Sequence, residues 1–301
     1  MKVGKKIFIT GGLGFVGKHL ADKMAEDGYD VVIFDKKEKK DPFKINFMRG
    51  DLREIETINL EGVDTVIHLA AEADVKSRSD LHYENNIQGT YNLLKKMVEK
   101  GVKKMVFTSS STVYGEAEKM PTPETYGPLK PISPYGASKL ACEALISSFC
   151  YSYGMQAIIF RMANVIGRDG HGVIKDFIEK LKVNDKELEI LGNGKQRKSY
   201  LHIEDAIEGI LTGCKEAKAN VEIYNLGSDD WTEVIDIADM VADEMGIKPE
   251  YRFNNELDGR GWVGDVKLML LDCTLLKSRG WKPKYNSREA VKKVIKEMLE
   301  D

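Results

Sequence analysis

The sequence predicts an α/β fold in which a doubly wound parallel sheet is followed by a smaller C-terminal lobe of α+β type. Over the first 165 residues, short runs that are apolar on both faces alternate with longer helical patterns. This alternation of strand and helix patterns changes after Gly167. We therefore expect one domain over residues 1–167 and a second over 168–301, with some later elements packing back on the first.

The individual elements follow from the length and periodicity of these runs. Buried parallel strands are expected at 5–10, 30–35, 63–70, 103–110 and 156–164. Helical patterns long enough to cross between parallel strands are clearest at 84–100 and 135–153. In the C-terminal lobe, helices are expected near 173–183, 203–217, 233–246 and 286–299, separated by short strands and glycine-rich turns.

Composition excludes several classes of function. Of 301 residues, 42% are hydrophobic, enough for a sizeable core, and no run approaches the roughly 18 apolar residues of a membrane span. The 45 basic and 48 acidic residues leave a net charge of −3, so no nucleic-acid partner is expected. The 4 cysteines form no C-x-x-C pair and the 5 histidines lack metal spacing, which predicts reduced thiols, a cytoplasmic location and no metal.

A glycine-rich turn follows the first predicted strand. Gly11, Gly14 and Gly17 in TGGLGFVG stand where a strand gives way to a helix. In a Rossmann-type domain the first glycine permits a tight turn, the second lets backbone approach a pyrophosphate, and the third allows close packing of helix on strand. The helix dipole and exposed N–H groups then favour an anion.

Two carboxylates follow at informative places. Asp35 ends the second strand, where a carboxylate binds the adenosine ribose hydroxyls and repels the extra phosphate of NADP, so NAD is the expected cofactor. Lys36 and Lys37 follow it and are read as solvated loop residues. Asp51, in RGDL, is either an adenine contact or a helix cap.

A serine, a tyrosine and a lysine form the candidate catalytic group. Tyr135 and Lys139 in SPYGASK stand four apart on one predicted helix face, so the ammonium can lie near the phenol. A free tyrosine has a pKa near 10, and a nearby lysine together with a bound cationic nicotinamide can lower it. Ser110 lies at the C-terminal end of the fourth of these strands, the sheet edge where ligands bind, and can hold a substrate oxygen.

Together, these motifs resemble the extended short-chain dehydrogenase/reductase family, and more narrowly its NAD-dependent nucleotide-sugar epimerases of the UDP-glucose (UDP-galactose) 4-epimerase type. The resemblance runs essentially from end to end. It is carried by TGGLGFVG (10–17), HLAA (68–71), NIQGT (86–90), SSSTVYG (109–115), YGASK (135–139) and RMANVIG (161–167).

The resemblance implies a tightly held NAD and 4-epimerisation of a UDP-hexose. Tyr135 would deprotonate the sugar 4-hydroxyl while hydride passes to the nicotinamide, and hydride would return to the other face of the 4-keto sugar. Ser110 would bind that hydroxyl, Asn86 would support the surroundings of the lysine, and Asn164 would touch the UDP moiety. It further implies cofactor contacts at Phe15, Val16, Leu52, Leu69, Ala70 and Ala71, and substrate contacts at Thr112, Val173 and Tyr200.

Within the family, sugar 4,6-dehydratases carry an acidic pair after the serine. Here Thr112, Val113 and Tyr114 follow, with no carboxylate until Glu116, which favours epimerisation. A related dehydratase, decarboxylase or reductase, and a non-catalytic NAD-sensing or RNA-associated relative, are the alternatives.

Two segments of the C-terminal lobe resemble the family's nucleotide-binding loops. In GNGKQRKSYLHIED (192–205), either Arg197 or Lys198 would pair with phosphate. In DGRGWVGDVK (258–267), Arg260 would pair with phosphate and Asp265 would bind ribose hydroxyls. Met269 stands where some members carry a bulky aromatic residue, so UDP-N-acetylhexosamines are a further expected substrate, unless Met269 belongs to the core. The resemblance also implies a homodimer built from the helices near 84–100 and 135–153.

Overall fold

The computed structural model describes residues 3–38, 45–75, 77–216 and 219–300, which form two compact units. Unit 1 comprises Met1–Val113, Pro134–Arg161 and Ile210–Tyr224. Unit 2 comprises Tyr114–Ser133, Met162–Gly209 and Asn225–Asp301. The chain therefore passes between the units several times, whereas the sequence suggested one main boundary after Gly167.

Unit 1 is built on a seven-stranded sheet in the order β11-β6-β5-β4-β1-β2-β3. Its strands are β1 (Lys6–Thr10), β2 (Asp30–Asp35), β3 (Asn46–Arg49), β4 (Thr65–His68), β5 (Lys104–Ser110), β6 (Gln156–Met162) and β11 (Val221–Leu226). β1 pairs in parallel with both β2 and β4, so the strand order reverses between β1 and β4. In doubly wound sheets, ligands bind at the carboxyl edge beside such a switch point.

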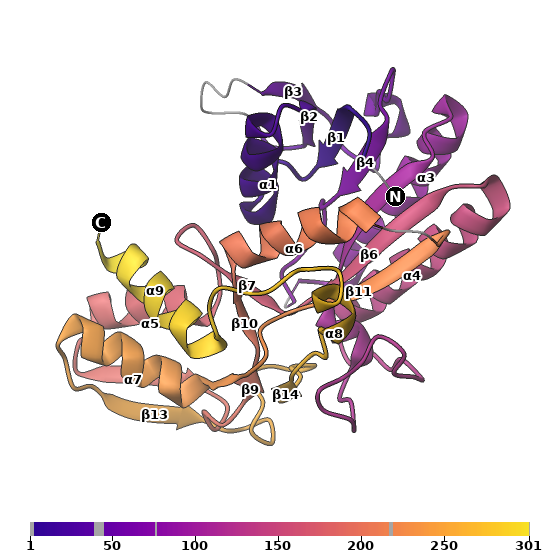
Figure 1. Ribbon diagram of the computed structural model, residues 1–301. Helices are drawn as coiled ribbons and strands as arrows, with labels where there is room; N and C mark the ends of the chain where they lie inside the picture. Colours follow the sequence, from indigo (N-terminus) through magenta and orange to yellow (C-terminus); the bar gives the residue numbers. More distant parts are fainter. Residues whose placement is uncertain (1–2, 39–44, 76, 217–218, 301) are drawn as a thin grey trace. The chain divides into compact units, whose positions relative to one another are not determined.

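Helices cover both faces of this sheet. Figure 1 shows α1 (Phe15–Glu26) on one side and α3 (Gly89–Lys100) and α4 (Pro134–Tyr153) on the other. The short elements are η1 (Ile55–Thr57), α2 (Ser79–His82), the π-helical η2 (Tyr83–Gln88) and η3 (Ser111–Tyr114). Fully buried side chains such as Phe8, Leu93 and Ile146 join β1, α3 and α4 into one core. This is the predicted Rossmann-type architecture.

Unit 2 contains short strands and a helical layer. Its strands are β7 (Asn164–Ile166), β8 (Glu187–Leu191), β9 (Arg197–Lys198), β10 (Tyr200–His202), β12 (Thr232–Glu233), β13 (Glu250–Asn254) and β14 (Leu268–Met269). Its helices are α5 (Val173–Val183), α7 (Val234–Met245), α8 (Thr274–Lys277) and α9 (Ser287–Leu299), while α6 (Ile203–Glu216) begins in unit 2 and ends in unit 1. The strands pair both ways, since β12 is antiparallel and β14 parallel to β9.

The core of unit 2 lies between its helices and β8 and β10. Phe177 of α5, Ile237 of α7 and Val291 of α9 are buried together there. Helix α9 starts with a capping box, in which Asn286 accepts from the backbone N–H of Glu289 and the Glu289 side chain accepts from that of Asn286. The result is the α+β lobe that the sequence predicts.

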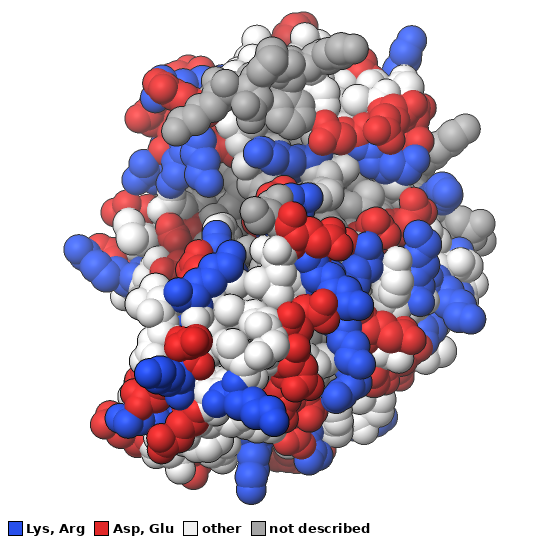
Figure 2. All heavy atoms as spheres, turned by 90° about the vertical axis from the view of Figure 1, so that its left-hand side faces the viewer, with Lys and Arg blue, Asp and Glu red and all other residues white. Residues whose placement is uncertain are grey.

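Basic and acidic side chains are interspersed on the face shown in Figure 2. Among the residues that the structure describes, none of the helices combines the length and apolar character needed to cross a bilayer.

Candidate active site

The glycine turn after β1 is closely packed. Gly11 has φ +69°, a conformation that favours glycine, and a Cβ there would lie 2.7 Å from the backbone of Ala70. A Cβ on Gly17 would lie 2.2 Å from the carbonyl oxygen of Gly11. At Gly14 the nearest atom would be that same oxygen, at 3.1 Å. The first and third glycines therefore bring backbone segments together, and the second leaves space beside the loop.

Helix α1 begins at this turn with its positive end uncompensated. Gly14 is its N-cap, no side chain among the described residues caps it, and its first turn, which includes the half-buried Phe15 and Val16, holds no acidic residue. An anion placed there would interact with the helix dipole and with unpaired backbone N–H groups. This arrangement fits the pyrophosphate of a dinucleotide.

Asp35 connects the end of β2 to the glycine turn. Its carboxylate accepts hydrogen bonds from the backbone N–H groups of Leu13 at 3.1 Å and Lys37 at 3.0 Å. Each oxygen can accept a further bond, which is what ribose hydroxyls require. Lys36 reaches Asn85 at 3.3 Å, and Lys37 is exposed.

The other predicted cofactor contacts surround the same edge of the sheet. Leu69, Ala70 and Ala71 follow β4 directly and are half-buried, whereas Leu52 is buried. Asp51 forms an ion pair with Arg53 at 2.7 Å, and this hydrogen bond lowers the pKa of the Asp51 carboxyl. It caps no helix, because the N-cap of η1 is Glu54. The glycine turn, the free end of α1 and Asp35 therefore supply what a dinucleotide needs.

Ser110 and Tyr135 meet where β5 ends and α4 begins. The Ser110 hydroxyl lies close enough to the Tyr135 phenol to act on its pKa, and it accepts from the hydroxyl of Thr112 at 2.9 Å. Burial nevertheless raises the pKa of Tyr135 to about 12, with the Ser110 hydrogen bond opposing that rise. In the protein alone the phenol is thus protonated at neutral pH.

Lys139 is buried beneath the same helix face. Its ammonium donates to the Thr108 carbonyl at 2.8 Å and lies 6.0 Å from the centroid of the Tyr135 ring. Burial lowers the pKa of Lys139 to about 8. The sequence argument expected Lys139 and a bound nicotinamide together to lower the pKa of the phenol, and in the protein alone burial is the largest cause of both shifts.

Asn86 holds the start of α4 through Ser138. Its amide donates to the Ser138 hydroxyl at 2.8 Å and to the Glu72 carbonyl at 3.1 Å, and its carbonyl accepts from the Glu72 N–H at 2.7 Å. Ser138 in turn donates to the Tyr135 carbonyl at 2.8 Å. These bonds connect the π-helical turn η2 to the start of α4.

Sequence reasoning missed two groups beside this cluster. The ring of buried His82 lies 5.8 Å from that of Tyr135, and its nitrogens have no hydrogen-bond partner among the described residues. Buried Glu143, one turn after Lys139, accepts from Arg161 at 2.7 Å and from Ser109 at 2.5 Å. In the sequence, Glu143 could have been recognised only from its position four residues after Lys139.

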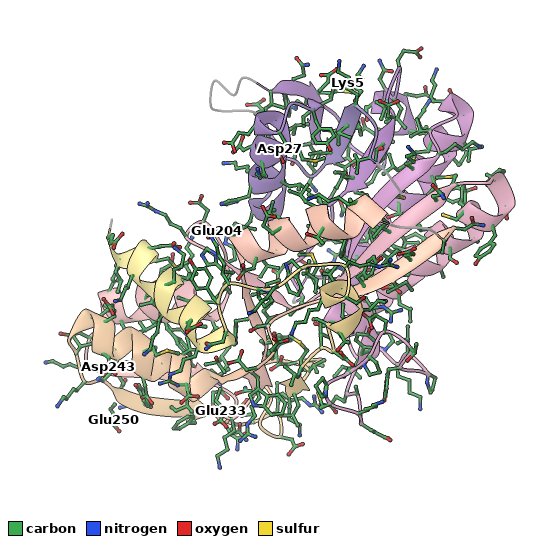
Figure 3. The ribbon with its side chains drawn as sticks, viewed as in Figure 1. Lys5, Asp27, Glu204, Glu233, Asp243 and Glu250 are labelled. Atoms are coloured by element: carbon green, nitrogen blue, oxygen red, sulfur yellow. The ribbon has the colours of Figure 1, made fainter. Side chains whose placement is uncertain are left out.

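In unit 2, each candidate phosphate-binding cation already has an acidic partner. Arg197 pairs with Glu233, labelled in Figure 3, at 2.6 Å. Lys198 forms a short ion pair with Asp265. Arg260 pairs with Glu116 at 2.7 Å.

The remaining predicted substrate contacts also lie in unit 2. Burial raises the pKa of the Tyr200 phenol, and the side chain of Asn164 opposes that rise. Val173 is half-buried at the start of α5. Met269 is 7% exposed, as a core methionine would be, and lies beside Lys198 in the pairing of β14 with β9.

Comparisons with known proteins agree with this fold. Residues 7–227 match the model of the NAD dependent epimerase/dehydratase family, so the chain belongs to that family, whose cofactor is NAD. Over 96% of the chain it is 33% identical to a "Putative UDP-glucose 4-epimerase" of Methanocaldococcus jannaschii, of which the match covers 97%. The crystal structure of a UDP-galactose 4-epimerase superposes with a TM-score of 0.88 at 39% identity, covering 98% of this chain and 99% of that one.

Dehydratases are also among the relatives. Mouse (Mus musculus) dTDP-D-glucose 4,6-dehydratase is 29% identical over 97% of this chain and 88% of its own length. The chain is therefore an enzyme of a nucleotide-sugar epimerase and dehydratase family.

Proposed function

We propose that the protein is a UDP-hexose 4-epimerase that interconverts UDP-glucose and UDP-galactose through a transient 4-keto sugar. The observation that carries this proposal is the placement of Ser110 and Tyr135 at the carboxyl end of β5, where Ser110 acts to lower the pKa of the phenol, with Lys139 buried behind them. That edge of the sheet also presents the glycine turn and Asp35, so a dinucleotide and a proton-transfer group can act on one substrate.

Each residue of the pair has a distinct chemical task. NAD, when bound, supplies the acceptor and later the donor of the hydride at carbon 4. The Tyr135 oxygen takes the proton of the 4-hydroxyl as the carbonyl forms, and returns it to the alkoxide that hydride return creates. Ser110 holds the same oxygen by a hydrogen bond, and Thr112 orients the Ser110 hydroxyl.

Tyr135 must lose its proton before it can act as a base. Its pKa of about 12 in the protein alone means that the phenolate needs a cation brought by the ligands. Oxidised nicotinamide carries a positive charge, and its exclusion of water strengthens that interaction. We therefore expect the pKa of Tyr135 to fall when NAD binds.

The residues after Ser110 favour epimerisation over dehydration. Elimination of water from carbons 5 and 6 needs an acid and a base beside the sugar. Thr112 and Val113 offer neither, and the first carboxylate after Ser110 is that of Glu116, six residues along the chain.

Purified protein should be incubated with UDP-glucose, UDP-galactose, UDP-N-acetylglucosamine and UDP-N-acetylgalactosamine, and the products resolved by NMR. We expect the first two to interconvert. The burial of Met269 supports a packing role, so we expect slower turnover of the N-acetylated pair. A 4-keto-6-deoxy product would instead identify a dehydratase, and an absorbance scan would report bound nicotinamide.

We also propose a homodimer through α3 and α4. Tyr91 of α3 and Tyr151 and Tyr153 of α4 are exposed on these helices, and such aromatic residues are enriched at interfaces. Tyr151→Glu should convert a dimer into a monomer in sedimentation velocity experiments. Val183→Glu, at an apolar residue of α5 that is even more exposed than Tyr151, is the control and should leave the dimer intact.

A further inference from the structure

The pairing of Arg260 with Glu116 has the geometry of an arginine bound to an oxyanion. Nη1 of Arg260 donates to Oε1 of Glu116 at 2.7 Å, and Nη2 donates to Oε2 at 2.8 Å. Nη1 also donates to the main-chain carbonyl of Asp265, which fixes the guanidinium independently of Glu116. A phosphate can accept from the same two guanidinium nitrogens with two of its oxygens, so a phosphate and a carboxylate compete for Arg260.

The neighbouring pair of Lys198 and Asp265 is far less suited to exchange. Their side chains are 12% and 1% exposed, and a second bond to Asp265 comes from the N–H of Gly261 at 3.0 Å. The Lys198 ammonium also lies 4.7 Å from the ring centroid of Trp262. Withdrawing Lys198 would leave a buried carboxylate without its counter-charge, which is strongly unfavourable.

Glu116, in contrast, can leave Arg260 easily. Its side chain is 42% exposed, so water solvates the carboxylate once it is released. The Arg260 hydrogen bond is the main reason why the pKa of Glu116 is lowered, and its backbone and charge contacts with Lys267 contribute less. Among the candidate cations of unit 2 that pair with acidic residues, Arg260 therefore has two features together. A backbone carbonyl holds its guanidinium in place, and its carboxylate partner can be displaced at low cost.

We propose that Glu116 is an internal counter-ion of Arg260 that the diphosphate of the substrate displaces. The inference rests on the proposed function, because it takes UDP as the nucleotide carrier. In the free protein Glu116 neutralises the charge of the guanidinium, which the Asp265 carbonyl holds in place. On binding, the diphosphate replaces Glu116 at the same two nitrogens, so part of the binding energy is spent on the exchange.

The direct consequence is that removing the Glu116 charge strengthens binding. Glu116→Gln should bind UDP about fivefold more tightly than wild type, the size of effect expected for one exposed ion pair. Glu118→Gln removes the same charge at an exposed position two residues along and should leave the affinity for UDP unchanged. Glu116→Ala serves as a second variant, with the same expected gain.

A double-mutant cycle by isothermal titration calorimetry with UDP tests this exchange. Arg260→Met should weaken UDP binding, and adding Glu116→Gln to Arg260→Met should bring no gain, since the competed cation is gone. The proposal is overturned if wild type binds UDP but neither Glu116 variant binds it more tightly, or if the gain persists in the Arg260→Met background. Failure of wild type to bind UDP at all would overturn the proposed function and this inference with it.

Discussion

The Lys139 ammonium donates a 2.8 Å hydrogen bond to the main-chain carbonyl of Thr108, two residues before Ser110. It also lies 4.8 Å from the ring centroid of Phe107. A carbonyl and an aromatic face are weak replacements for water, and burial accordingly lowers the pKa of Lys139 to about 8. Burying the Lys139 ammonium beside the candidate base Tyr135 therefore lowers the stability of the folded protein.

Replacing Lys139 by Met should therefore stabilise NAD-free protein at neutral pH. In the unfolded chain the Lys139 side chain keeps its proton up to a pKa near 10.4. Burial of the ammonium therefore lowers the free energy of unfolding by its full amount below pH 8, and this effect disappears as the pH rises from 8 to 10.4. After subtraction of the lost hydrogen bond we expect the variant to gain about 1–3 kcal/mol at pH 7. Urea unfolding at pH 7 and pH 10 measures this gain, and a variant less stable than wild type at pH 7 would refute it.

The burial of His68 predicts that the folded protein loses stability in acid. Its ring lies buried between the hydroxyls of Thr10 at 2.7 Å and Thr90 at 2.9 Å, and burial lowers its pKa to about 3. In the unfolded chain His68 takes up a proton near pH 6.5, whereas in the folded protein it does so only near pH 3. The free energy of unfolding therefore has its full value above pH 6.5 and falls by about 1.4 kcal/mol per pH unit towards pH 3.

Unfolding free energies between pH 6.5 and 4 test this assignment. His68→Gln should flatten the slope by about 1.4 kcal/mol per pH unit relative to wild type, whereas His171→Gln, at an exposed position, should not change it. Equal slopes in the His68 variant and wild type would show that another group titrates.

Gly17 and Gly14 should respond differently to alanine. A Cβ on Gly17 would meet the Gly11 carbonyl at 2.2 Å, so Gly17→Ala should lower the free energy of unfolding by about 1–3 kcal/mol. Gly14 has φ −76° and a nearest neighbour at 3.1 Å, so Gly14→Ala should fold almost normally but bind NAD about tenfold more weakly. Denaturant melts and NAD titrations measure both, and equal destabilisation by the two substitutions would contradict this account of the turn.

The sequence predicted the fold of unit 1 well because its strands are buried on both faces and its helices connect them directly. It gave no bounds for β3, whose Asn46 and Arg49 are exposed at the sheet edge, and although it expected some later elements to pack back on the first domain, it did not identify β11 as the strand that joins the sheet. Edge strands carry little hydrophobic signal, and distant pairing leaves none in local periodicity.

The candidate site was predictable where residue spacing fixes geometry. Ser110 lies close enough to Tyr135 to act on the pKa of the phenol, and Asp35 accepts a hydrogen bond from Leu13 in the glycine turn. The electrostatics could not be read from spacing, because burial outweighs the lysine in setting the pKa of Tyr135. The partner of Arg260 was equally hidden, since Glu116 is distant in sequence.

The most direct test of the central claim compares Tyr135→Phe with wild type in the conversion of UDP-galactose to UDP-glucose, followed by NMR, with UDP affinity measured in parallel. Tyr151→Phe, at a tyrosine that is 71% exposed on the same helix, is the control. The account predicts that Tyr135→Phe turns over at least about a thousandfold more slowly, as loss of the proton-transfer group requires, with UDP affinity within about twofold of wild type. Turnover by Tyr135→Phe at the wild-type rate would contradict it.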